Sequence, residues 1–343
     1  MAEDVLSRLS GKQLTRFLED ELKPKGDDID SMNKEVDQFV RFLHQCSDPP
    51  FTVDRVVKGG SLGKGTAVRG SSDIDLEVVF NGLSSIEELK NNREVLLDRI
   101  ERAAEKYKWR GGIQQTKRTK FSIQFKLNGK DVDVLPVFDA MKRKEGFQFQ
   151  LHVDAVRLYL ESTGDIYRQM DRYREGAEIA AKEYSASLSE LQIAEVKGVD
   201  ARVKDVIRLL KFWKKHSDSE ATRQIPSYSM ELLALHMSRR YMSLGIEDLF
   251  RKCMGKLGCC HDIRVAFDAN YDSRRYTGRA DPPYILDPAN PLMNTLSGLD
   301  HKEVTRAAQR YFQDFYNQHP QLESPSKKRR LRAAQRQLAL SYH

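Results

Sequence analysis

The sequence predicts an α+β fold of two lobes, in which a small, mainly antiparallel sheet with flanking helices is followed by a helical lobe. The clearest sign of the sheet is Asn128-Gly129, the strongest short hairpin signal, between the alternating segment 121–127 and the apolar segment 131–135. The clearest sign of the helical lobe is that apolar positions from about 153 to 322 recur almost throughout at helical spacing. This change in pattern divides the chain near residue 150.

The first half combines helices and strands. Apolar residues at helical spacing, such as Leu14, Leu18 and Leu22, predict amphipathic helices, and Pro49-Pro50 ends the second of them. We expect helices at 12–22, 31–45 and 87–107, and strands at 51–57, 73–80, 121–127 and 131–135. A glycine-rich turn, 59–65, separates the first two strands.

The second half carries helical patterns with few interruptions. We expect helices at 153–170, 188–196, 202–216, 228–240 and 302–318. The first lobe is accordingly assigned to residues 1–152 and the helical lobe to residues 153–322. Residues 323–343 form a basic tail with the run Lys327 to Arg330, which is compatible with a nuclear localisation signal, an RNA-contacting arm or a solvated tail.

The composition is that of a soluble globular protein with polyanionic partners. The 343 residues are 40% hydrophobic and 31% charged, and no stretch approaches the roughly 20 apolar residues that a membrane span needs. The chain does not begin with a basic segment followed by an apolar run, so we expect a protein of the cytoplasm, or of cytoplasm and nucleus, with no membrane partner. The net charge of +7 favours nucleotides or nucleic acid as partners.

Three carboxylates on two predicted strands form the candidate catalytic centre. Asp73 and Asp75 lie two residues apart on one strand, so period-two geometry places both side chains on the same face. Asp133 lies on another predicted strand, between apolar neighbours. Carboxylates this close would repel one another, and a pair of divalent cations would remove that cost. Taken alone, an Asp-x-Asp pair is also compatible with a solvated strand edge.

A glycine-rich segment precedes the carboxylates and adds phosphate chemistry to the prediction. From Gly59 to Thr66 it reads Gly-Gly-Ser-Leu-Gly-Lys-Gly-Thr, so backbone N–H groups can approach phosphate closely and Ser61 can donate a hydrogen bond. It is not a Walker A loop, whose glycine spacing differs and which opens a helix, whereas a strand is predicted to follow here. The arrangement in this chain is Gly-Ser, then a short spacer, then Asp-x-Asp on a strand. This arrangement is typical of polymerase-beta-like nucleotidyltransferases.

The helical lobe offers further contacts for a triphosphate and a base. Lys204, Arg208, Lys211 and Lys215 recur at spacings of four, three and four, which makes one basic stripe on a helix. Such a stripe is also common on solvated helices. Tyr228 follows Pro-Ser at the start of another predicted helix, where it could stack on a base or pack in the core.

Taken together, these segments resemble the 2′-5′-oligoadenylate synthetases. The longest match is the segment 56–66, continued by Arg69-Gly70 and Ser72 to Asp75, which resembles the family's phosphate loop and metal motif. Four shorter segments of this chain also match the family. Residues 133–140 resemble its third-carboxylate segment, residues 207–213 its donor-binding helix, and residues 228–233 and 285–291 two motifs that follow. The matching blocks follow one another in order between about residues 12 and 320.

The resemblance implies a bilobal nucleotidyltransferase of antiviral innate immunity, with its active site between the lobes. Asp73, Asp75 and Asp133 would be the catalytic residues and would hold two Mg²⁺. The implied contacts to the donor ATP are Gly60, Ser61, Lys211, Ser227 and Tyr228. A 2′-hydroxyl of the acceptor would attack the α-phosphorus of the donor in line and release pyrophosphate.

One departure from the family keeps a different product open. Ser227 stands where synthetases of vertebrate type carry a glutamine that contacts the donor. A Ser-Tyr pair at this place is closer to cyclic GMP-AMP synthase and its relatives. A cyclic-dinucleotide synthase is therefore the alternative enzyme.

A second departure concerns double-stranded RNA, the family's regulatory partner. Ile193 stands where the family places a basic residue that contacts RNA. The remaining candidate nucleic-acid contacts are Arg55, Lys58, Lys64 and Lys197. The stretch from Lys106 to Lys130 also carries eight basic residues and no acidic one. An RNA-dependent enzyme, an RNA-independent enzyme and an inactive RNA-binding module all remain open, although the intact carboxylates argue against the last.

Three cysteines and a histidine in the second half resemble, in part, the zinc thumb of cyclic GMP-AMP synthase. Cys253 is followed by Cys259, Cys260 and His261. No later cysteine follows, and a histidine next to the cysteine pair cannot easily complete a tetrahedral site. The alternative is that the thiols pack in or near the core.

Overall fold

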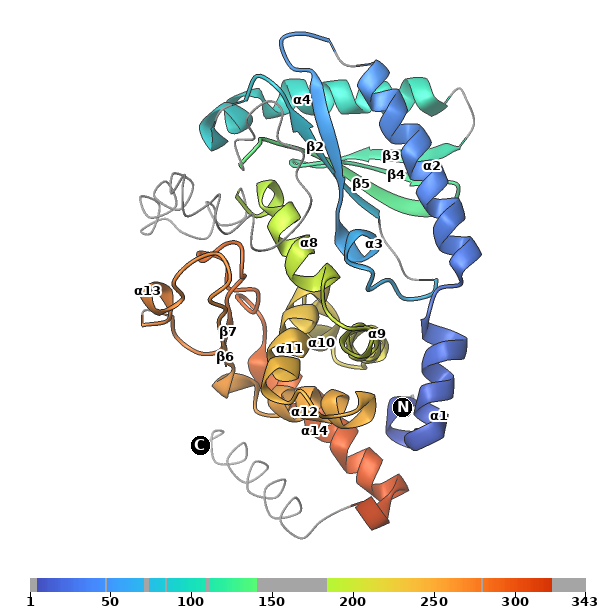
Figure 1. The fold of residues 1–343 in the computed structure, drawn as a ribbon, viewed down its shortest axis with the longest axis vertical. Coiled ribbons are helices and arrows are strands. Elements are labelled where there is room, and N and C mark those ends of the chain that lie inside the picture. Colours follow the sequence, from blue (N-terminus) through green and yellow to red (C-terminus); the bar gives the residue numbers. More distant parts are fainter. Residues whose placement is uncertain are drawn as a thin grey trace.

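The computed structural model describes residues 5–46, 48–70, 74–83, 85–108, 112–140, 184–278 and 280–322. They form a sheet-based lobe and a helical lobe that follow each other along the long axis of the molecule (Figure 1). This arrangement confirms the predicted α+β class. Asp73, the expected helix 153–170, the expected boundary at 152 and the tail 323–343 lie outside the described residues.

Five strands form the sheet: β1 (Val53–Lys58), β2 (Ile74–Phe80), β3 (Ile113–Arg118), β4 (Ile123–Leu127) and β5 (Lys130–Val137). Their order is β1-β2-β5-β4-β3, and of the four neighbouring pairs β2–β5 is parallel and the others are antiparallel. The sheet is thus mainly antiparallel, as the sequence predicts. Strand β3 is not predicted by the sequence, because its residues Ile-Gln-Gln-Thr-Lys-Arg include a single large apolar side chain. Strand β3 lies at the edge of the sheet and most of its side chains are solvated, so it needs no second large apolar side chain.

The predicted hairpin joins β4 and β5. Asn128 has a φ of 47° and Gly129 a φ of 80°, the left-handed pair that a type I′ turn requires. The turn sets Leu127 opposite Lys130, and the same register places Gln124 opposite Asp133. The hairpin therefore positions one of the predicted catalytic carboxylates.

Helices α2 (Gly26–Gln45) and α4 (Ile86–Lys108) lie beside the sheet (Figure 1), and their apolar side chains belong to the core of the sheet lobe. Side chains alternate between the two faces of a strand, so Leu76 and Val134 join this core while Asp75 and Asp133 lie on the other face. The sheet thus presents a polar face, on which the predicted site lies.

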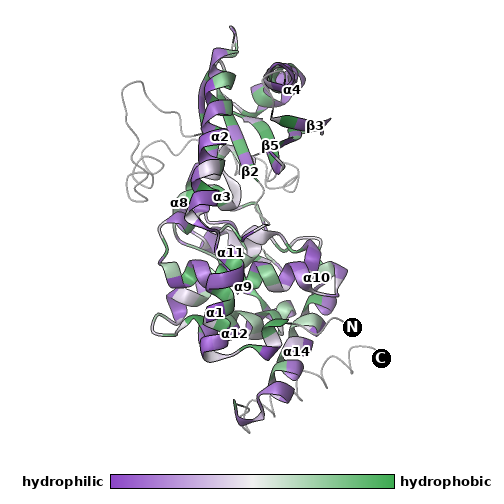
Figure 2. Cartoon of the chain, turned by 90° about the vertical axis from the view of Figure 1, so that its right-hand side faces the viewer, coloured by the Kyte–Doolittle hydropathy of each residue, from purple (hydrophilic) through white to green (hydrophobic). Residues whose placement is uncertain are grey.

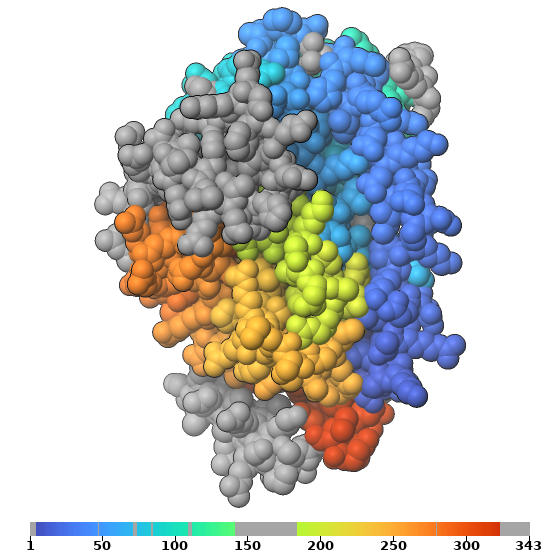
Figure 3. All heavy atoms as spheres, viewed as in Figure 1, coloured from blue at the N-terminus to red at the C-terminus, as the bar shows by residue number. Residues whose placement is uncertain are grey.

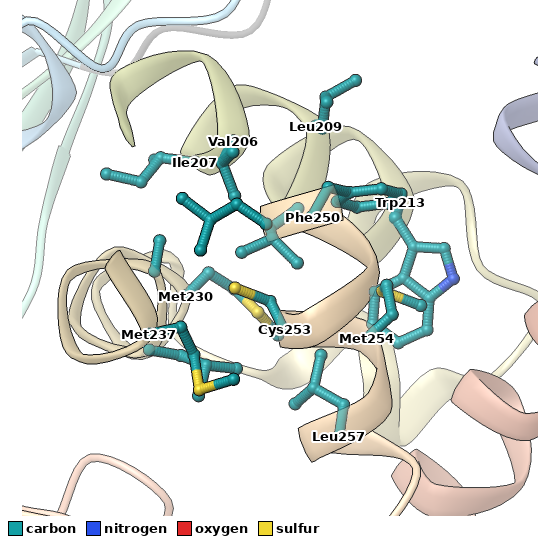
Figure 4. Close-up of a cluster of buried hydrophobic side chains, with 14 of the residues drawn as sticks. Val206, Ile207, Leu209, Trp213, Met230, Met237, Phe250, Cys253, Met254 and Leu257 are labelled. Atoms are coloured by element: carbon teal, nitrogen blue, oxygen red, sulfur yellow. The ribbon is translucent and has the colours of Figure 1, made fainter. Parts of the chain in front are cut away.

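The helical lobe contains α8 (Ser189–Lys197), α9 (Ala201–His216), α10 (Glu220–Gln224), α11 (Ser227–Arg240), α12 (Ile246–Leu257), α13 (Arg274–Thr277) and α14 (His301–Gln318). Helix α9 begins at the cap Asp200, whose carboxylate accepts a hydrogen bond from the N–H of Val203 at 2.9 Å. Its apolar face packs against Phe250 and Cys253 of α12 (Figure 4). The four helices that the sequence predicts among these described residues are confirmed, whereas α12 is not predicted. None of the described helices combines the length and apolar character that crossing a bilayer takes.

Smaller elements complete the lobes. A parallel pair of two-residue strands, β6 (Arg264–Val265) and β7 (Tyr284–Ile285), lies in the helical lobe. Short 3-10 segments occur at Val5–Arg8, Cys260–Asp262 and Pro320–Leu322. Helix α3 (Gly60–Lys64) and helix α8 lie at the level where the two lobes meet (Figure 2).

The two cores do not follow the predicted division of the chain at residue 152. Helix α1 (Gly11–Phe17) and the π-helical turn Leu18–Leu22 bury their leucines in the helical lobe, against α9 and its neighbours. Figure 3 shows the first residues of the chain, in blue, running down the side of that lobe to the end of α14, in red. Conversely, Tyr184 and Leu188 pack in the sheet lobe. Sequence periodicity predicts that a face is buried, but not which lobe buries it.

Candidate active site

The segment between β1 and β2 forms the short helix α3 rather than the predicted turn. Gly60 enters the helix with a φ of 56°, and Gly65 leaves it with a φ of 70°, both in the left-handed region that favours glycine. The N–H of Gly59 donates to the carbonyl of Asp75 at 2.7 Å. This bond fixes the start of α3 beside β2, the strand that carries Asp75.

Asp75 and Asp133 are direct neighbours across the parallel strands β2 and β5. Oδ2 of Asp133 accepts a hydrogen bond from Nε2 of Gln124 at 3.1 Å, whereas its Oδ1 is buried and has no hydrogen-bond partner among the described residues. A buried carboxylate oxygen without a donor, beside a second carboxylate, fits a divalent cation such as Mg²⁺, which prefers oxygen ligands. The structure thus brings two of the three predicted carboxylates together, and Asp73 is the residue before the start of β2.

Glycine at position 60 gives the carboxylates room. A Cβ atom at Gly60 would lie 2.0 Å from Oδ2 of Asp75, far inside any normal contact. At Gly59 a Cβ atom would lie 2.3 Å from Oε1 of Glu77. The two glycines therefore let the backbone of the loop lie directly against the acidic face of β2.

Gly60→Ala is expected to reduce turnover about tenfold or more, because its Cβ would displace the carboxylate of Asp75. Gly70→Ala is the matched control: Gly70 has a φ of 69°, but no atom lies within 4 Å of its Cβ position. Both variants should lose about 1 kcal/mol of unfolding free energy from the left-handed backbone. Steady-state kinetics and thermal unfolding separate the effects, and equal losses of turnover would show that backbone strain, not the contact with Asp75, is responsible.

Glu77 is a further carboxylate on this face that sequence reasoning missed. It follows Asp75 by two residues on β2 and is 6% exposed. Burial, with the neighbouring charge of Asp75, raises the pKa of Glu77 to about 8. The signal was present in the sequence, because Asp73, Asp75 and Glu77 continue one period-two face.

A buried ion cluster centred on Glu231 joins α3, α9 and α11. Nζ of Lys211 lies 2.5 Å from Oε1 of Glu231, and Nζ of Lys64 lies 3.1 Å from its Oε2. The hydroxyl of Thr66 donates to Oε1 of Glu231 at 2.7 Å. Burial opposes the ionisation of Glu231, but Lys64 and Lys211 outweigh it and lower the pKa to about 2. Lys64 and Lys211 thus share one carboxylate, and burial lowers the pKa of Lys211. An anionic group such as phosphate would stabilise the positive charge of both lysines.

Tyr228 lies beside this cluster and is held at both ends. Nζ of Lys64 lies 3.9 Å from the centre of its ring, and its hydroxyl donates to Oδ1 of Asp287 at 3.2 Å. Oδ2 of Asp287 accepts from Nε2 of Gln192 at 2.6 Å. Burial raises the pKa of Asp287 to about 6. Asp287 and Gln192, whose positioning role the sequence did not reveal, hold the tyrosine that was predicted to contact a base.

One cavity of about 940 Å³ between the lobes collects the predicted donor residues. Its lining includes Gly60, Ser61, Lys211, Ser227 and Tyr228. Asp75, Lys64 and Glu231 line it as well. The cavity therefore combines a short helix N-terminus, buried cations, an aromatic ring and the carboxylate of Asp75, which is a composition suited to a nucleoside triphosphate.

Two of the four predicted nucleic-acid contacts, Arg55 and Lys64, form ion pairs with carboxylates of the protein. Nη2 of Arg55 lies 2.9 Å from Oε2 of Glu190 and 3.1 Å from Oδ1 of Asp139. Burial opposes the charge of Arg55, yet these two carboxylates raise its pKa. Lys64 is 7% exposed and is paired with Glu231. The charges of Arg55 and Lys64 thus tie α8 and α11 to the sheet lobe, and a contact of either side chain with nucleic acid stays a prediction.

The other two predicted nucleic-acid contacts, Lys58 and Lys197, line a cavity of about 490 Å³ beside α3, and Arg55 lines it as well. Nζ of Lys58 lies 2.8 Å from Oδ1 of Asp37 on α2. Lys197 lines the same cavity with Lys204 and Ile193. Burial, with the charges of Arg208 and Lys197, lowers the pKa of Lys204. This cavity retains basic side chains at a surface next to the phosphate loop.

The cysteines lie in or near the core of the helical lobe. Cys253 is fully buried among apolar side chains (Figure 4), and burial raises the pKa of its thiol. Burial raises the pKa of Cys260 to about 12. Within the described part of the chain, no group of three or more potential His, Cys, Asp or Glu ligands comes together around a metal position. Both thiols therefore stay protonated at neutral pH and pack as small apolar groups.

The chain matches two family models in succession. Residues 10–150 match the Second Messenger Oligonucleotide or Dinucleotide Synthetase domain, and residues 161–329 match the C-terminal domain 2 of 2′-5′-oligoadenylate synthetase 1. The rat 2′-5′-oligoadenylate synthase 1A is 28% identical over 336 residues, which cover 87% of each chain. The mouse 2′-5′-oligoadenylate synthase 1A is 28% identical over 83% of this chain and 82% of its own length, whereas this chain spans 40% of mouse 2′-5′-oligoadenylate synthase 2.

Solved structures resemble the fold over both lobes. CdnC of E. coli MS115-1, solved with ATP, superposes with a TM-score of 0.58 at 19% identity and covers 94% of this chain and 95% of its own. A c-di-GMP synthase, CdnE of Capnocytophaga granulosa, gives a TM-score of 0.52 at 14% identity over 90% of this chain and 88% of its own. At such identities the likeness concerns the fold, which is that of nucleotidyltransferases.

Proposed function

The chain belongs to the 2′-5′-oligoadenylate synthetase family of nucleotidyltransferases, and on this premise we propose that it joins ATP into 2′-5′-linked oligoadenylates and releases pyrophosphate. The observation that supports this most is the cavity of about 940 Å³ in which all five predicted donor residues lie beside Asp75. Relatives of similar length, the rat and mouse synthases 1A, carry the name of this activity.

The proposed donor site divides the ATP between the lobes. Ser61 and the free N–H groups at the start of α3 approach the triphosphate, because glycine at positions 59 and 60 keeps side chains out of the way. Lys64 and Lys211 neutralise the charge of the triphosphate. Two ammonium groups share the single carboxylate of Glu231, so one positive charge is left for the ligand. Tyr228 contacts the base, and its hydrogen bond to Asp287 fixes the ring.

The proposed catalytic centre consists of Asp73, Asp75 and Asp133. These carboxylates would hold two Mg²⁺, which supply charge neutralisation for the attacking oxygen and the departing pyrophosphate. Gln124 fixes one oxygen of Asp133 and leaves the other toward the site. The remaining work of the protein is to hold donor and acceptor in line, which is the main contribution to catalysis in phosphoryl transfer.

A cyclic dinucleotide is the second candidate product. It is favoured by Ser227, which replaces the glutamine of the vertebrate synthetases, and by the match of residues 10–150 to the Second Messenger Oligonucleotide or Dinucleotide Synthetase domain. The hydroxyl of Ser227 accepts a hydrogen bond from Nζ of Lys214 at 3.3 Å, so it lies within reach of a cation at the rim of the donor cavity.

If double-stranded RNA regulates the enzyme, its contact surface is the cavity of about 490 Å³ beside α3. Because Lys64 is buried beside Glu231, an RNA face would have to use the basic residues that line this cavity, which are Arg55, Lys58, Lys197 and Lys204. This is a small number of phosphate contacts, and such contacts dominate affinity for duplex RNA. We therefore expect RNA to enhance synthesis rather than to be required for it.

Incubation of nuclease-treated protein with ATP and Mg²⁺, with and without duplex RNA, tests these proposals. Linear 2′-5′ oligomers in both arms, identified by chromatography and mass, are the expected result. Product only with RNA would overturn the expected mode of regulation. A cyclic dinucleotide from mixed triphosphates, with no product from ATP alone, would replace the leading proposal by the second.

A further inference from the structure

A large cavity lies in the helical lobe, where the end of α11, helix α12 and helix α14 meet. Its volume is about 730 Å³. Figure 1 shows α12 and α14 in the part of this lobe that is farther from the sheet. Among the described residues, none that lines this cavity also lines the donor cavity. The proposed reaction therefore leaves this cavity unused.

The wall of this cavity includes a glycine near the end of α12, Gly255. Glycine weakens a helix relative to other residues, so its presence there needs a reason. Its φ lies outside the left-handed region, and among the described residues outside its own helix a Cβ atom would have a single neighbour within 4 Å, Cζ of Phe312 at 3.9 Å. Neither the backbone nor the packing requires glycine at this position. A larger side chain would extend into the cavity, so Gly255 keeps the space open.

Aromatic rings line the cavity from two helices. The rings of Phe312 and Tyr316 lie one turn apart on α14, with their centres 6.1 Å apart and their planes 18° from parallel. Tyr241 lines the cavity from the end of α11, and Nζ of Lys252 lies 4.9 Å from the centre of its ring. Nearly parallel rings on one face of a helix offer a flat apolar surface, on which a planar base can stack.

A buried amide supplies a hydrogen-bond acceptor beside these rings. Gln309 lines the cavity and is 8% exposed, and its Nε2 donates to the carbonyl of Gly258 at 3.1 Å. That bond fixes the orientation of the amide, and no described residue donates to its Oε1. Buried acceptors normally have a donor, so this oxygen favours a ligand with an N–H group, such as the amino group of a nucleobase.

Two lysines of α12 bring positive charge to the same cavity. Lys252 and Lys256 lie one helical turn apart and line the cavity together. Nζ of Lys256 donates to the carbonyl of Asp262 at 3.0 Å, and among the described residues neither lysine forms an ion pair. The carboxylate of Asp248 lies 3.7 Å from Nη1 of Arg251 instead. The lining thus holds three cations against two carboxylates, and a phosphate near both lysines would offset their repulsion.

We propose that this cavity is a second nucleotide-binding site, which takes a purine nucleotide and lies apart from the donor site. The base stacks on Phe312 and Tyr316, and its amino group donates to Oε1 of Gln309. The phosphate contacts Lys252 and Lys256. A fatty acid would match the rings and the cations, but it would leave the acceptor of Gln309 without a donor. A free mononucleotide and an oligoadenylate share the required chemistry, and the experiment below distinguishes them.

The reaction of Cys259 with N-ethylmaleimide measures occupancy of the cavity. Cys259 lines the cavity and is partly exposed, whereas the equally accessible Cys46 packs against the core of the sheet lobe and serves as the internal reference. In full-length protein, saturating AMP should slow the labelling of Cys259 about fivefold or more, because a pocket ligand covers most of the surface of its site. Labelling of Cys46, followed by peptide mass spectrometry, should not change. Inorganic phosphate and decanoate at the same concentration should not protect Cys259.

Changes to the ligand and to the protein test the individual contacts. Purine riboside 5′-monophosphate lacks the amino group, so half-protection should need about fivefold more of it than of AMP, the effect of one lost hydrogen bond to Gln309. Lys252→Ala should raise the half-protecting concentration of AMP about tenfold, the effect of one lost charge-assisted contact. Lys130→Ala removes an exposed lysine of β5 that does not line the cavity, and it should behave as wild type. Equal losses in the two variants would overturn the site in favour of general electrostatic attraction.

The source of the nucleotide follows from one further comparison. Half-protection of Cys259 at a lower concentration of AMP than of 2′-5′-linked triadenylate identifies a free mononucleotide as the ligand. The reverse order identifies an oligoadenylate. Both results support the site, whereas protection by decanoate or phosphate and not by AMP would show that the nucleotide assignment is wrong.

Gly255→Leu fills the cavity without removing a polar contact. In equilibrium dialysis this variant should bind one AMP fewer per chain than wild type, whatever the donor cavity binds. Its unfolding midpoint should be unchanged or higher, because leucine is a better helix former than glycine. Gly255→Ala adds only a methyl group and should keep the stoichiometry of wild type. If Gly255→Leu binds as many AMP molecules as wild type, the site is wrong, and the proposed reaction stands or falls separately by its own product assay.

Discussion

Asp75→Asn is expected to lower turnover about a thousandfold or more while leaving the protein folded. The substitution keeps the shape of the side chain but removes the charge that would bind metal, and metal-held charge neutralisation supplies several kcal/mol of transition-state stabilisation. Asp75 also adds to the raised pKa of Glu77, so removing its charge relieves repulsion. Thermal stability should therefore be unchanged or higher. Pyrophosphate release and differential scanning fluorimetry measure the two effects.

Asp131→Asn is the control for this experiment. Asp131 precedes Asp133 by two residues on β5, but it is exposed and paired with Lys126. Its neutralisation should change turnover less than about threefold, because exposed ion pairs contribute little. Turnover of Asp75→Asn within tenfold of wild type would mean that Asp75 does not hold a catalytic metal.

Glu231→Gln is expected to have the largest effect on stability. Glu231 is 2% exposed and is the carboxylate shared by Lys64 and Lys211, so its neutralisation leaves two buried cations without a counter-charge. Removing one partner of a buried ion pair costs about 3–5 kcal/mol. The midpoint of thermal unfolding should fall by about 5–10 °C. Glu94→Gln, which removes an exposed partner of Arg118, should cost less than about 0.5 kcal/mol.

ATP should reverse part of this loss. A triphosphate in the donor cavity would supply the negative charge that Glu231→Gln removes, so ATP should raise the unfolding midpoint of the variant more than that of wild type. Equal stabilisation of the two proteins by ATP would show that Lys64 and Lys211 do not contact the triphosphate.

The parts of the fold that the sequence predicts are those determined by neighbouring residues. Asn128-Gly129 requires only its own backbone to form a type I′ turn, and the period-two spacing of Asp73 and Asp75 requires only a strand. The pairing of Asp75 with Asp133 follows once both strands are recognised, although the parallel register itself is a tertiary feature. The local pattern was sufficient here because Asp75 and Asp133 lie on regular strands.

The parts that the sequence does not predict depend on contacts between distant segments. Lys211 was expected to contact phosphate, and nothing in its helix indicates that Glu231 of another helix lies 2.5 Å from it. Lys64 was expected at the surface, because a lysine in a glycine-rich loop is usually solvated. Its burial results from the docking of α11 against α3, which no local pattern encodes.

The exchange of segments between the two cores determines when the protein can fold during synthesis. Leu14, Leu18 and Leu22 leave the ribosome early, but the core that buries them also contains Phe315 of α14. At about 5–20 residues per second, the interval between Leu22 and Phe315 lasts roughly 15–60 s. Over that time the core around the first apolar stripe of the nascent chain is incomplete, so the stripe is a binding site for chaperones and a starting point for aggregation. The sheet lobe also waits, because it needs Leu188 and Leu191, so neither lobe can complete its core at the midpoint of translation.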